Sequence, residues 1–172
     1  MKGGKTMNCT LREWHLEDAE ELCSIMNNQK IQANLRDGIP YPYRKRDAEE
    51  FILTTLLSNR ELSLAITSQD KVVGSIGVFR QENIHFRTAE VGYYIAEPHW
   101  GKGLGTAALK IMCQKVFETT DIVRIFAEPF SDNPASCHML EKAGFQHEGT
   151  LKKNAVKNGQ FKDMQMYSLI KA

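Results

Sequence analysis

Three alternating glycines lie between a predicted strand and a predicted helix in the second half of the chain. The segment reads Glu97-Pro98-His99-Trp100-Gly101-Lys102-Gly103-Leu104-Gly105-Thr106-Ala107-Ala108. Glycine adopts backbone conformations that other residues avoid, so successive N–H groups of such a loop can point toward one place. At the positive end of a helix, these groups bind an anion such as a pyrophosphate. The loop therefore predicts a strand–loop–helix unit that binds a phosphorylated ligand.

Other interpretations of the same loop compete with this one. A Walker loop requires the pattern G-x-x-x-x-G-K-[ST], which the segment lacks. A dinucleotide-binding fingerprint fits Gly103, Gly105 and Ala108, and Glu128 then stands where a ribose-binding acid belongs. However, residues 97–100 separate the strand from the first glycine, and no run of β-α-β repeats surrounds the unit. A structural turn without any ligand is the remaining alternative.

Hydrophobic periodicity and turn residues divide the chain into short elements. Strands are predicted at residues 8–14, 62–67, 71–79, 88–96, 124–128, 145–152 and 161–171. Helices are predicted at residues 17–27, 48–59, 102–119 and 133–143. The last helix is well signalled, with Asn133 as its N-cap, Pro134 in its first position and Gly144 after its end.

This order of elements mixes an antiparallel meander with parallel crossovers. It predicts an α+β domain with a mixed, mostly antiparallel sheet of six to seven strands and about four helices. We expect one domain at residues 8–172, preceded by a flexible leader at residues 1–7. Residues 35–43 form a loop that is rich in aromatic residues and helix breakers.

Charge and cysteine usage exclude several classes of function. Lys and Arg number 22 and Asp and Glu number 21, which does not indicate a nucleic-acid-binding surface. No apolar run is long enough to cross a membrane, and the N-terminus lacks the apolar stretch of a signal peptide. The four cysteines are scattered without the spacing of metal ligands, so we expect reduced thiols, no metal and a cytoplasmic location.

Two motifs together resemble those of a known family. The first is the strand Ala89-Glu90-Val91-Gly92-Tyr93-Tyr94-Ile95 followed by the glycine loop. The second joins Asn133-Pro134-Ala135-Ser136 to Leu140-Glu141-Lys142-Ala143-Gly144-Phe145. At this separation they resemble the GCN5-related N-acetyltransferase (GNAT) superfamily, in particular its ribosomal-protein (Rim-type) branch. The resemblance covers residues 8–171 in element order, and its specific residues lie between 90 and 145.

The resemblance implies the GNAT fold, in which the sheet is splayed at its centre, and acetyl-CoA as co-substrate. The pantetheine arm would lie in the gap beside Tyr94 and Ile95, with Asn133 and Ser136 in contact with it. The pyrophosphate would bind the loop and the helix start, at Gly101, Lys102, Gly103, Leu104, Gly105 and Thr106. A solvated side chain is an equal alternative for Lys102. Trp100 departs from the Arg or Gln that is frequent there in the wider superfamily, although aromatic residues are familiar in the Rim-type branch.

Acetyl transfer to an amine requires proton acceptors and hydrogen-bond donors in defined places. A primary amine is almost fully protonated at neutral pH, so a base or desolvation must help. We expect Glu90 to be this base, with a solvent-facing carboxylate as the alternative and His85 as a weaker candidate. An unpaired N–H near Ile95 would stabilise the oxyanion. Many family members carry a tyrosine acid at the position of Leu140, and in the Rim-type branch Ser136 would assist the leaving thiol instead.

The loop at residues 36–43 and the final hairpin at residues 154–163 are expected to wall the acceptor site. Tyr41, Tyr43 and Glu90 are the predicted substrate-binding residues, although the two tyrosines could instead pack the loop onto the domain. Asp163 could attract a cationic amine or be an ordinary turn residue. The predicted function is N-acetylation of a protein N-terminus or a small amine by direct attack in a ternary complex, with a homodimer as a possible assembly. A catalytically inactive acyl-CoA sensor is the alternative.

Overall fold

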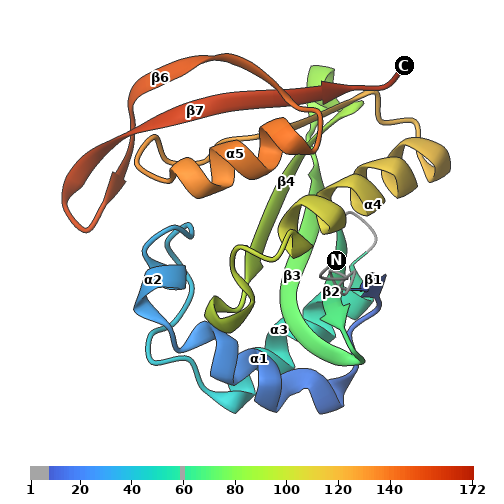
Figure 1. Ribbon diagram of the computed structural model, residues 1–172, viewed down its shortest axis with the longest axis vertical. Coiled ribbons are helices and arrows are strands. Elements are labelled where there is room, and N and C mark those ends of the chain that lie inside the picture. Colours follow the sequence, from blue (N-terminus) through green and yellow to red (C-terminus); the bar gives the residue numbers. More distant parts are fainter. Residues whose placement is uncertain (1–7, 59–60) are drawn as a thin grey trace, which may run out of the picture.

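Seven strands form one sheet in the computed structural model, which describes residues 8–58 and 61–172. The expected leader at residues 1–7 lies outside these described residues. Across the sheet the order is β1 (Cys9–Arg12), β2 (Glu61–Ser68), β3 (Lys71–Arg80), β4 (Thr88–Ile95), β5 (Arg124–Ala127), β7 (Gln160–Ile170) and β6 (Gln146–Lys157). The neighbours β4 and β5 run parallel, whereas the other neighbouring strands pair antiparallel (Figure 1). The predicted mixed, mostly antiparallel sheet is therefore confirmed.

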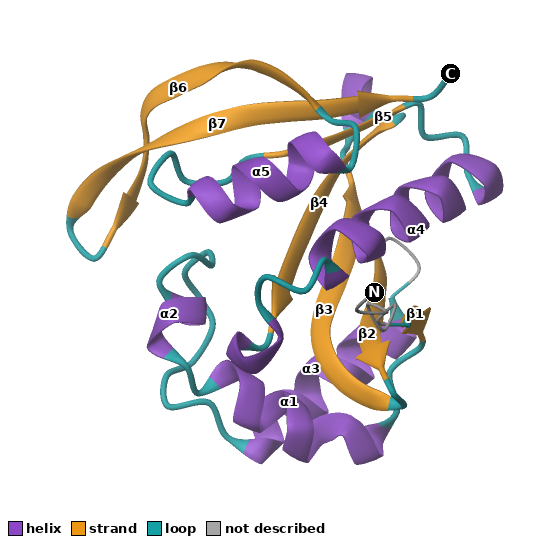
Figure 2. Ribbon diagram, viewed as in Figure 1, coloured by secondary structure: helices purple, strands orange, loops and turns teal. Residues whose placement is uncertain are grey.

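Five α-helices flank the sheet in the described part of the chain, one more than the sequence indicated (Figure 2). They are α1 (Ala19–Met26), α2 (Gln29–Gln32), α3 (Lys45–Leu57), α4 (Leu104–Thr119) and α5 (Pro134–Lys142), with three 3₁₀ turns at η1 (Leu16–Asp18), η2 (Asn83–His85) and η3 (Glu97–His99). The additional helix is α2, whose single turn is capped by the Asn28 side chain accepting from the N–H groups of Lys30 and Ile31. One turn is too short for hydrophobic periodicity to reveal.

The helices cover the two faces of the sheet and bury a separate apolar cluster on each. On one face α4 and α5 bury the larger cluster, whose fully buried members include Ile76, Leu109, Met112, Ile125 and Leu140. On the other face α1 and α3 bury a second cluster, which includes Trp14, Leu22 and Ile52. None of the helices within residues 8–58 and 61–172 is long and apolar enough to cross a membrane.

Both ends of α5 follow from local sequence. The Asn133 side chain accepts a hydrogen bond from the Ser136 N–H at 3.3 Å, which confirms Asn133 as the N-cap. After the helix Gly144 adopts a φ of +99°, a conformation that residues with a Cβ rarely adopt. The N–H of Phe145 then donates to the Leu140 carbonyl at 3.0 Å and closes a Schellman motif. These signals place Ser136 in the first turn of α5.

The largest difference from the predicted elements lies in the last hairpin. Strand β6 continues to Lys157 rather than ending at residue 152, and an irregularity interrupts its pairing with β7 between Leu151 and Ala155. Lys153 within this irregularity has a φ of +51°, so the alternation of side chains breaks there. Figure 1 shows that the hairpin projects beyond the rest of the sheet, toward the side where α2 lies.

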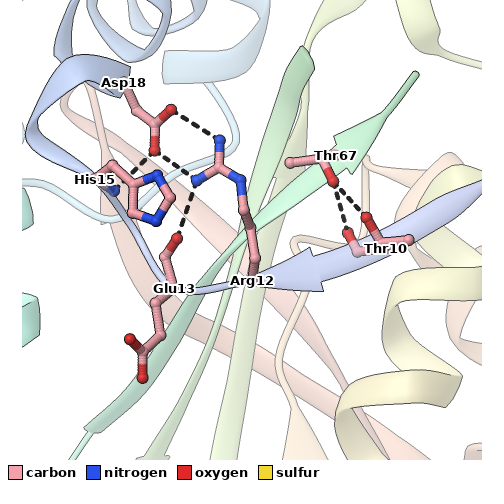
Figure 3. A network of polar contacts seen from close by, with 6 residues as sticks. All are labelled: Thr10, Arg12, Glu13, His15, Asp18 and Thr67. Carbon is pink, nitrogen blue, oxygen red and sulfur yellow. Dashed lines mark hydrogen bonds and ion pairs between the residues drawn. The ribbon is translucent and has the colours of Figure 1, made fainter. Parts of the chain in front are cut away.

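A polar network fixes the edge strand β1 to its surroundings (Figure 3). The Arg12 guanidinium donates to both oxygens of Asp18, at 2.7 and 2.8 Å, and the His15 N–H donates to Asp18 at 2.9 Å. Burial acts to raise the Asp18 pKa, but the bonds from Arg12 and His15 outweigh it and hold that pKa below its usual range. The network ties the end of β1 to the start of the first helical segment.

Candidate active site

The two parallel central strands separate part-way along β4. Pairing between them covers residues 88–90 of β4 and residues 124–126 of β5, and its last pair is Glu90 with Phe126. Strand β4 nevertheless continues to Ile95, still paired with β3 on its other side. Among the described residues, no strand pairs with one edge of residues 91–95, and this edge is the gap that the sequence resemblance implied.

Main-chain groups of alternate residues face this gap. The Ala96 N–H donates to Val73 of β3 at 2.7 Å, whereas the Arg87 carbonyl accepts from Val123, which precedes β5. Because both main-chain groups of a strand residue point to the same neighbour, odd-numbered residues from Val91 to Ile95 face the gap. Tyr94 faces β3 instead, since a Cβ added to Gly74 would lie 2.3 Å from the Tyr94 carbonyl oxygen.

The two residues of β4 that were predicted to lie beside the pantetheine arm, Tyr94 and Ile95, therefore face different neighbours. Ile95 has an N–H group that faces the gap, and its carbonyl accepts a hydrogen bond from the Trp100 indole at 2.7 Å. Tyr94 packs its side chain against the second apolar cluster, where burial raises the pKa of its hydroxyl. Neither part of Tyr94 is directed to the gap, so the assignment of Tyr94 to the coenzyme is not supported.

The glycine loop joins the end of β4 to α4. Gly101 and Gly103 have φ values of +71° and +78°, and a Cβ at either would meet no atom within 4 Å. These glycines are therefore needed for backbone conformation and for an open surface in front of the loop. Helix α4 begins at Leu104, two residues later than predicted, so Lys102 belongs to the exposed loop.

The first turn of α4 presents free N–H groups at the positive end of a sixteen-residue helix. The first intrahelical bond runs from the Ala107 N–H to the Gly103 carbonyl, which leaves the N–H groups of Leu104, Gly105 and Thr106 without helical partners. Trp100 was not predicted to take part, yet its bond to Ile95 holds the loop against the end of β4. Backbone groups and glycines together form a site that suits a pyrophosphate.

Two carboxylates and one guanidinium meet where β4 and β5 separate. The Arg36 Nη2 atom donates to Glu90 Oε1 at 2.6 Å and lies 3.9 Å from Glu128 Oε2. Burial, and then the negative charge of Glu90, raise the pKa of Glu128, while Arg36 acts to lower it. The sequence indicates Glu128 only through the dinucleotide-binding fingerprint, and Arg36 belongs to neither of the two acetyltransferase-like motifs.

A hydroxyl pair lies on the opposite face of β4. The Tyr93 Oη atom lies 2.7 Å from Ser136 Oγ, which joins the strand to the first turn of α5. Ser136 is 8% exposed, and burial raises the Tyr93 pKa above its usual range. Leu140, which stands at the position of the family's tyrosine acid, is fully buried in the larger apolar cluster. The sequence indicated Ser136 but not its tyrosine partner.

The remaining predicted substrate residues differ in their placement. Tyr41 is 52% exposed, whereas Tyr43 is 7% exposed and belongs to the second apolar cluster. The N–H and the carbonyl of Tyr43 both bond to the Asn27 side chain, at 2.8 and 2.6 Å. Tyr43 therefore packs the loop onto the domain, as the alternative interpretation of this residue stated. His85 lies on the exposed turn η2. The Asp163 carboxylate accepts from the Lys153 N–H at 2.7 Å and stabilises the hairpin irregularity.

The loop at residues 35–43, called the aromatic loop from here on, approaches the last hairpin on the side of the sheet where Glu90 lies. The Lys157 ammonium donates to Asp37 at 2.7 Å, and the neighbouring residue Arg36 contacts Met164 of β7 at 3.8 Å, a weak bond to sulfur. The loop is thus held at two successive residues, one by the hairpin tip and one by the central strands. These contacts bring the loop and the hairpin together, and an acceptor site walled by residues 36–43 and 154–163 stays a prediction.

Comparison with known proteins supports the resemblance to the GNAT superfamily that the two sequence motifs indicated. The sequence model of the family described as "Acetyltransferase (GNAT) domain" matches residues 8–146. The uncharacterized N-acetyltransferase p20 of Bacillus licheniformis is 30% identical over 172 residues, which span 96% of this chain and 94% of p20. The crystal structure of the microcin C7 self-immunity acetyltransferase MccE, in complex with acetyl-CoA and AMP, is 28% identical with a TM-score of 0.82, covering 94% of this chain and 92% of MccE.

The fold also matches a structure from the Rim-type branch. RimL, described as a ribosomal L7/L12 alpha-N-protein acetyltransferase in complex with coenzyme A, superimposes with a TM-score of 0.85 at 22% identity, over 98% of this chain and 96% of RimL. At this identity the likeness concerns the fold. It excludes the dinucleotide-binding alternative, because the glycine loop belongs to a splayed mixed sheet rather than to a run of parallel units. The chain belongs to the GNAT family of acetyltransferases.

Proposed function

We propose that this chain transfers the acetyl group of acetyl-CoA to a primary amine by direct attack in a ternary complex. The observation that carries the proposal is the division of polar groups between the two faces of β4 at the gap. Glu90 and Glu128 lie on one face, whereas Tyr93 and Ser136 lie on the other. Such a division gives the amine a proton acceptor and the thioester sulfur a hydrogen-bond donor, each on its own side of the reacting carbonyl carbon.

On the acceptor side, an ammonium group must lose a proton before it attacks. Glu90 remains our first candidate for the base, and Glu128 is its close neighbour through Arg36. The raised pKa of Glu128 makes that carboxylate a better proton acceptor than an ordinary glutamate. We therefore assign deprotonation of the amine to this pair of carboxylates.

On the donor side, the chain supplies main-chain and hydroxyl donors. The N–H groups of the glycine loop and of the first turn of α4 would hold the pyrophosphate. The Ile95 N–H faces the gap and would stabilise the oxyanion that forms on the acetyl oxygen. Ser136 would donate to the sulfur as the carbon–sulfur bond breaks, and Asn133, which caps the same helix turn, would lie beside the pantetheine arm.

For the acceptor we propose either a protein N-terminus or a small-molecule amine. RimL, with which this chain shares its fold, is described as acting on the alpha-amine of a protein. The exposed Tyr41 would line the entrance, between the aromatic loop and the last hairpin. Tyr43 is not part of this proposal, because it is a core residue.

Isothermal titration with acetyl-CoA tests the donor assignment, with NADH as the control ligand. Binding of acetyl-CoA alone is the expected result, and no binding would overturn the proposal. Turnover is then measured with a panel of amines that includes N-terminal peptides, amino acids and polyamines. Binding without turnover of any member would favour the alternative of an acyl-CoA sensor, for which the replacement of the family's tyrosine by Leu140 is the supporting observation.

A further inference from the structure

The hydroxyl groups of Tyr93 and Ser136 form an isolated pair beside the gap. Their oxygen atoms are 2.7 Å apart, and the only other described contact of the Tyr93 hydroxyl is the Ser136 carbonyl oxygen at 3.4 Å. Each hydroxyl has one proton to donate, so one oxygen of the pair must donate to the other. The direction of this bond decides whether the Ser136 proton remains available to a ligand.

Chemistry favours Tyr93 as the donor. A phenol is a stronger acid than an aliphatic hydroxyl, and it therefore donates the stronger hydrogen bond. Burial of Tyr93 keeps the phenol protonated, because it raises the pKa. The other titratable groups that act on Tyr93 are Cys113 of α4 and Cys137 of α5, and burial raises the pKa of both thiols, that of Cys113 to about 12. Both thiols therefore stay neutral and do not compete for the phenol proton.

We propose that Tyr93 is a positioning residue: its hydroxyl donates to Ser136 Oγ and thereby directs the serine's own proton toward the sulfur of coenzyme A. This inference rests on the proposed function, which places the thioester in the gap beside Ser136. Tyr93 lies on the gap-facing edge of β4, three residues beyond the last pair with β5, and Ser136 approaches it from the first turn of α5.

The reaction balances without an alkoxide. The amine nitrogen attacks the acetyl carbon, the carbon–sulfur bond breaks with its electron pair on sulfur, and the amide forms. The ammonium loses one proton to the carboxylate pair before the attack, the nitrogen loses a second as the amide forms, and both protons pass from the carboxylates to water. Ser136 keeps its oxygen–hydrogen bond and donates a hydrogen bond to the thiolate, which leaves as it is or takes a proton from water. Tyr93 exchanges no proton and fixes the orientation of Ser136.

This arrangement explains how the chain tolerates leucine where many relatives carry a tyrosine acid. Leu140 lies one turn after Ser136 on α5 and is fully buried among apolar side chains. In this chain the phenol belongs to Tyr93 of β4 and acts through Ser136 of α5. The two residues together supply one oriented hydrogen-bond donor.

The test is the pKa of the thiol of bound coenzyme A, measured from thiolate absorbance as the pH is raised. The wild-type protein is compared with Ser136→Ala, Tyr93→Phe and the double variant. The matched control is Tyr167→Phe, because the Tyr167 hydroxyl also bonds to α5, at 2.8 Å from Glu141 Oε1, but does not contact Ser136. The measurement needs no acceptor, so it does not depend on which amine is acetylated.

In the wild type the donated hydrogen bond lowers the thiol pKa. Ser136→Ala and Tyr93→Phe are each expected to raise it by about one unit, with no further rise in the double variant and none in Tyr167→Phe. An unchanged thiol pKa in Tyr93→Phe, with a rise in Ser136→Ala, would overturn the role of Tyr93. Additive effects of the two substitutions would also overturn it. A wild-type protein that does not bind coenzyme A would contradict the proposed function itself.

A second measurement covers the case in which the phenylalanine variant is poorly folded. Circular dichroism and the coenzyme A dissociation constant establish that Tyr93→Phe retains its structure. With an acceptor in hand, Tyr93→Phe should lower kcat about tenfold at an unchanged dissociation constant for acetyl-CoA. A fall in coenzyme affinity with unchanged kcat would contradict the positioning role and leave Tyr93 with a purely structural one.

Discussion

The Arg36 Nη2 atom lies 2.6 Å from Glu90 Oε1, although 54 residues separate the two positions in sequence. One guanidinium from the aromatic loop thus pairs with the carboxylate at the last residue of β4 that pairs with β5. The same group lies 3.9 Å from Glu128. A cation of the chain therefore lies next to both candidate bases. An incoming amine must bind beside this cation or displace it.

Replacing this cation should change the pH dependence of catalysis. Arg36 acts to lower the pKa of Glu128, so Arg36→Met leaves that carboxyl with a pKa raised further by burial and by Glu90. A base must be deprotonated to act, and a higher pKa requires a higher pH for this. We expect the acidic limb of kcat/KM to move to higher pH, measured over the range in which the protein stays folded.

The matched control for this variant is Arg80→Met. Arg80 also pairs with a carboxylate, Asp121, at 2.6 Å, and its contacts lie at the other end of β3 from the glycine loop. This control should leave the pH profile unchanged. An acidic limb that stays in place in Arg36→Met would remove Glu128 from the group that accepts the amine proton.

The glycine loop should not tolerate an acidic side chain. Gly103→Glu places bulk and negative charge in front of the free N–H groups of α4, and it should weaken acetyl-CoA binding at least tenfold, or about 1.4 kcal/mol. Gly159→Glu is the matched control, because Gly159 in the last hairpin has a φ of +75° against +78° for Gly103, and both face open space. Titration calorimetry compares the two. Equal affinities would refute the assignment of the loop to the pyrophosphate.

Restoring the family's tyrosine at residue 140 should damage the protein rather than improve it. Leu140 is fully buried, so Leu140→Tyr must fit a larger ring and a hydroxyl into the core, at a cost of about 1–3 kcal/mol of unfolding free energy. Leu140→Met conserves volume and should cost less than about 1.5 kcal/mol. Urea denaturation measures both. A tyrosine variant that is fully stable and faster than wild type would show that the helix position is free to supply the acid.

An ion pair outside the candidate active site, between Arg124 and Glu148, should make the stability of the fold depend on pH. The Arg124 guanidinium donates to both oxygens of Glu148, at 2.8 and 2.5 Å, and Ser168 donates to the same carboxylate at 2.7 Å. Arg124, and then Ser168, lower the Glu148 pKa to about 2. Because the folded pKa is depressed, this stabilisation is complete above the unfolded value of about 4.3 and is lost as the pH falls toward 2.

Glu148→Gln tests this link between β5, β6 and β7. At neutral pH the variant should have the lower Tm, by a small amount because the pair is partly exposed and worth less than about 1 kcal/mol. The difference in Tm should shrink as the pH is lowered through about 4 toward 2. A difference that is the same at every pH would mean that the carboxylate charge does not contribute.

Features governed by neighbouring residues could be read from the sequence. The limits of α5 follow from Asn133, Pro134 and Gly144, and the structure reproduces them to within one residue. The sequence predicts that α4 starts at Lys102, because lysine favours helix. The helix starts two residues later, at Leu104, because Gly103 before it has a positive φ that is not helical. The irregularity at Lys153 was not visible, since its positive φ is stabilised by the Asp163 side chain of the partner strand.

Features that join distant residues could not be read in this way. Glu90 and Ser136 are predicted site residues because they stand in motifs, but their hydrogen-bond partners Arg36 and Tyr93 lie 54 and 43 positions away. Only the register of β4 and the path of the aromatic loop bring these pairs together. The same limit applies to Tyr43, because its main-chain bonds to the side chain of Asn27, 16 residues away, could not be read from the sequence.

Strand β4 places Glu90 and Tyr93 on opposite faces, three residues apart in one extended segment. Glu90 meets Arg36 of the aromatic loop, and Tyr94 on the same face packs against the second apolar cluster, whereas Tyr93 on the other face meets Ser136 of α5. In the proposed function, β4 therefore separates the side on which the amine binds from the side on which the thiol leaves. In that function, substitutions in the loop and the hairpin are expected to change which amine is accepted, while the residues that meet the coenzyme stay the same.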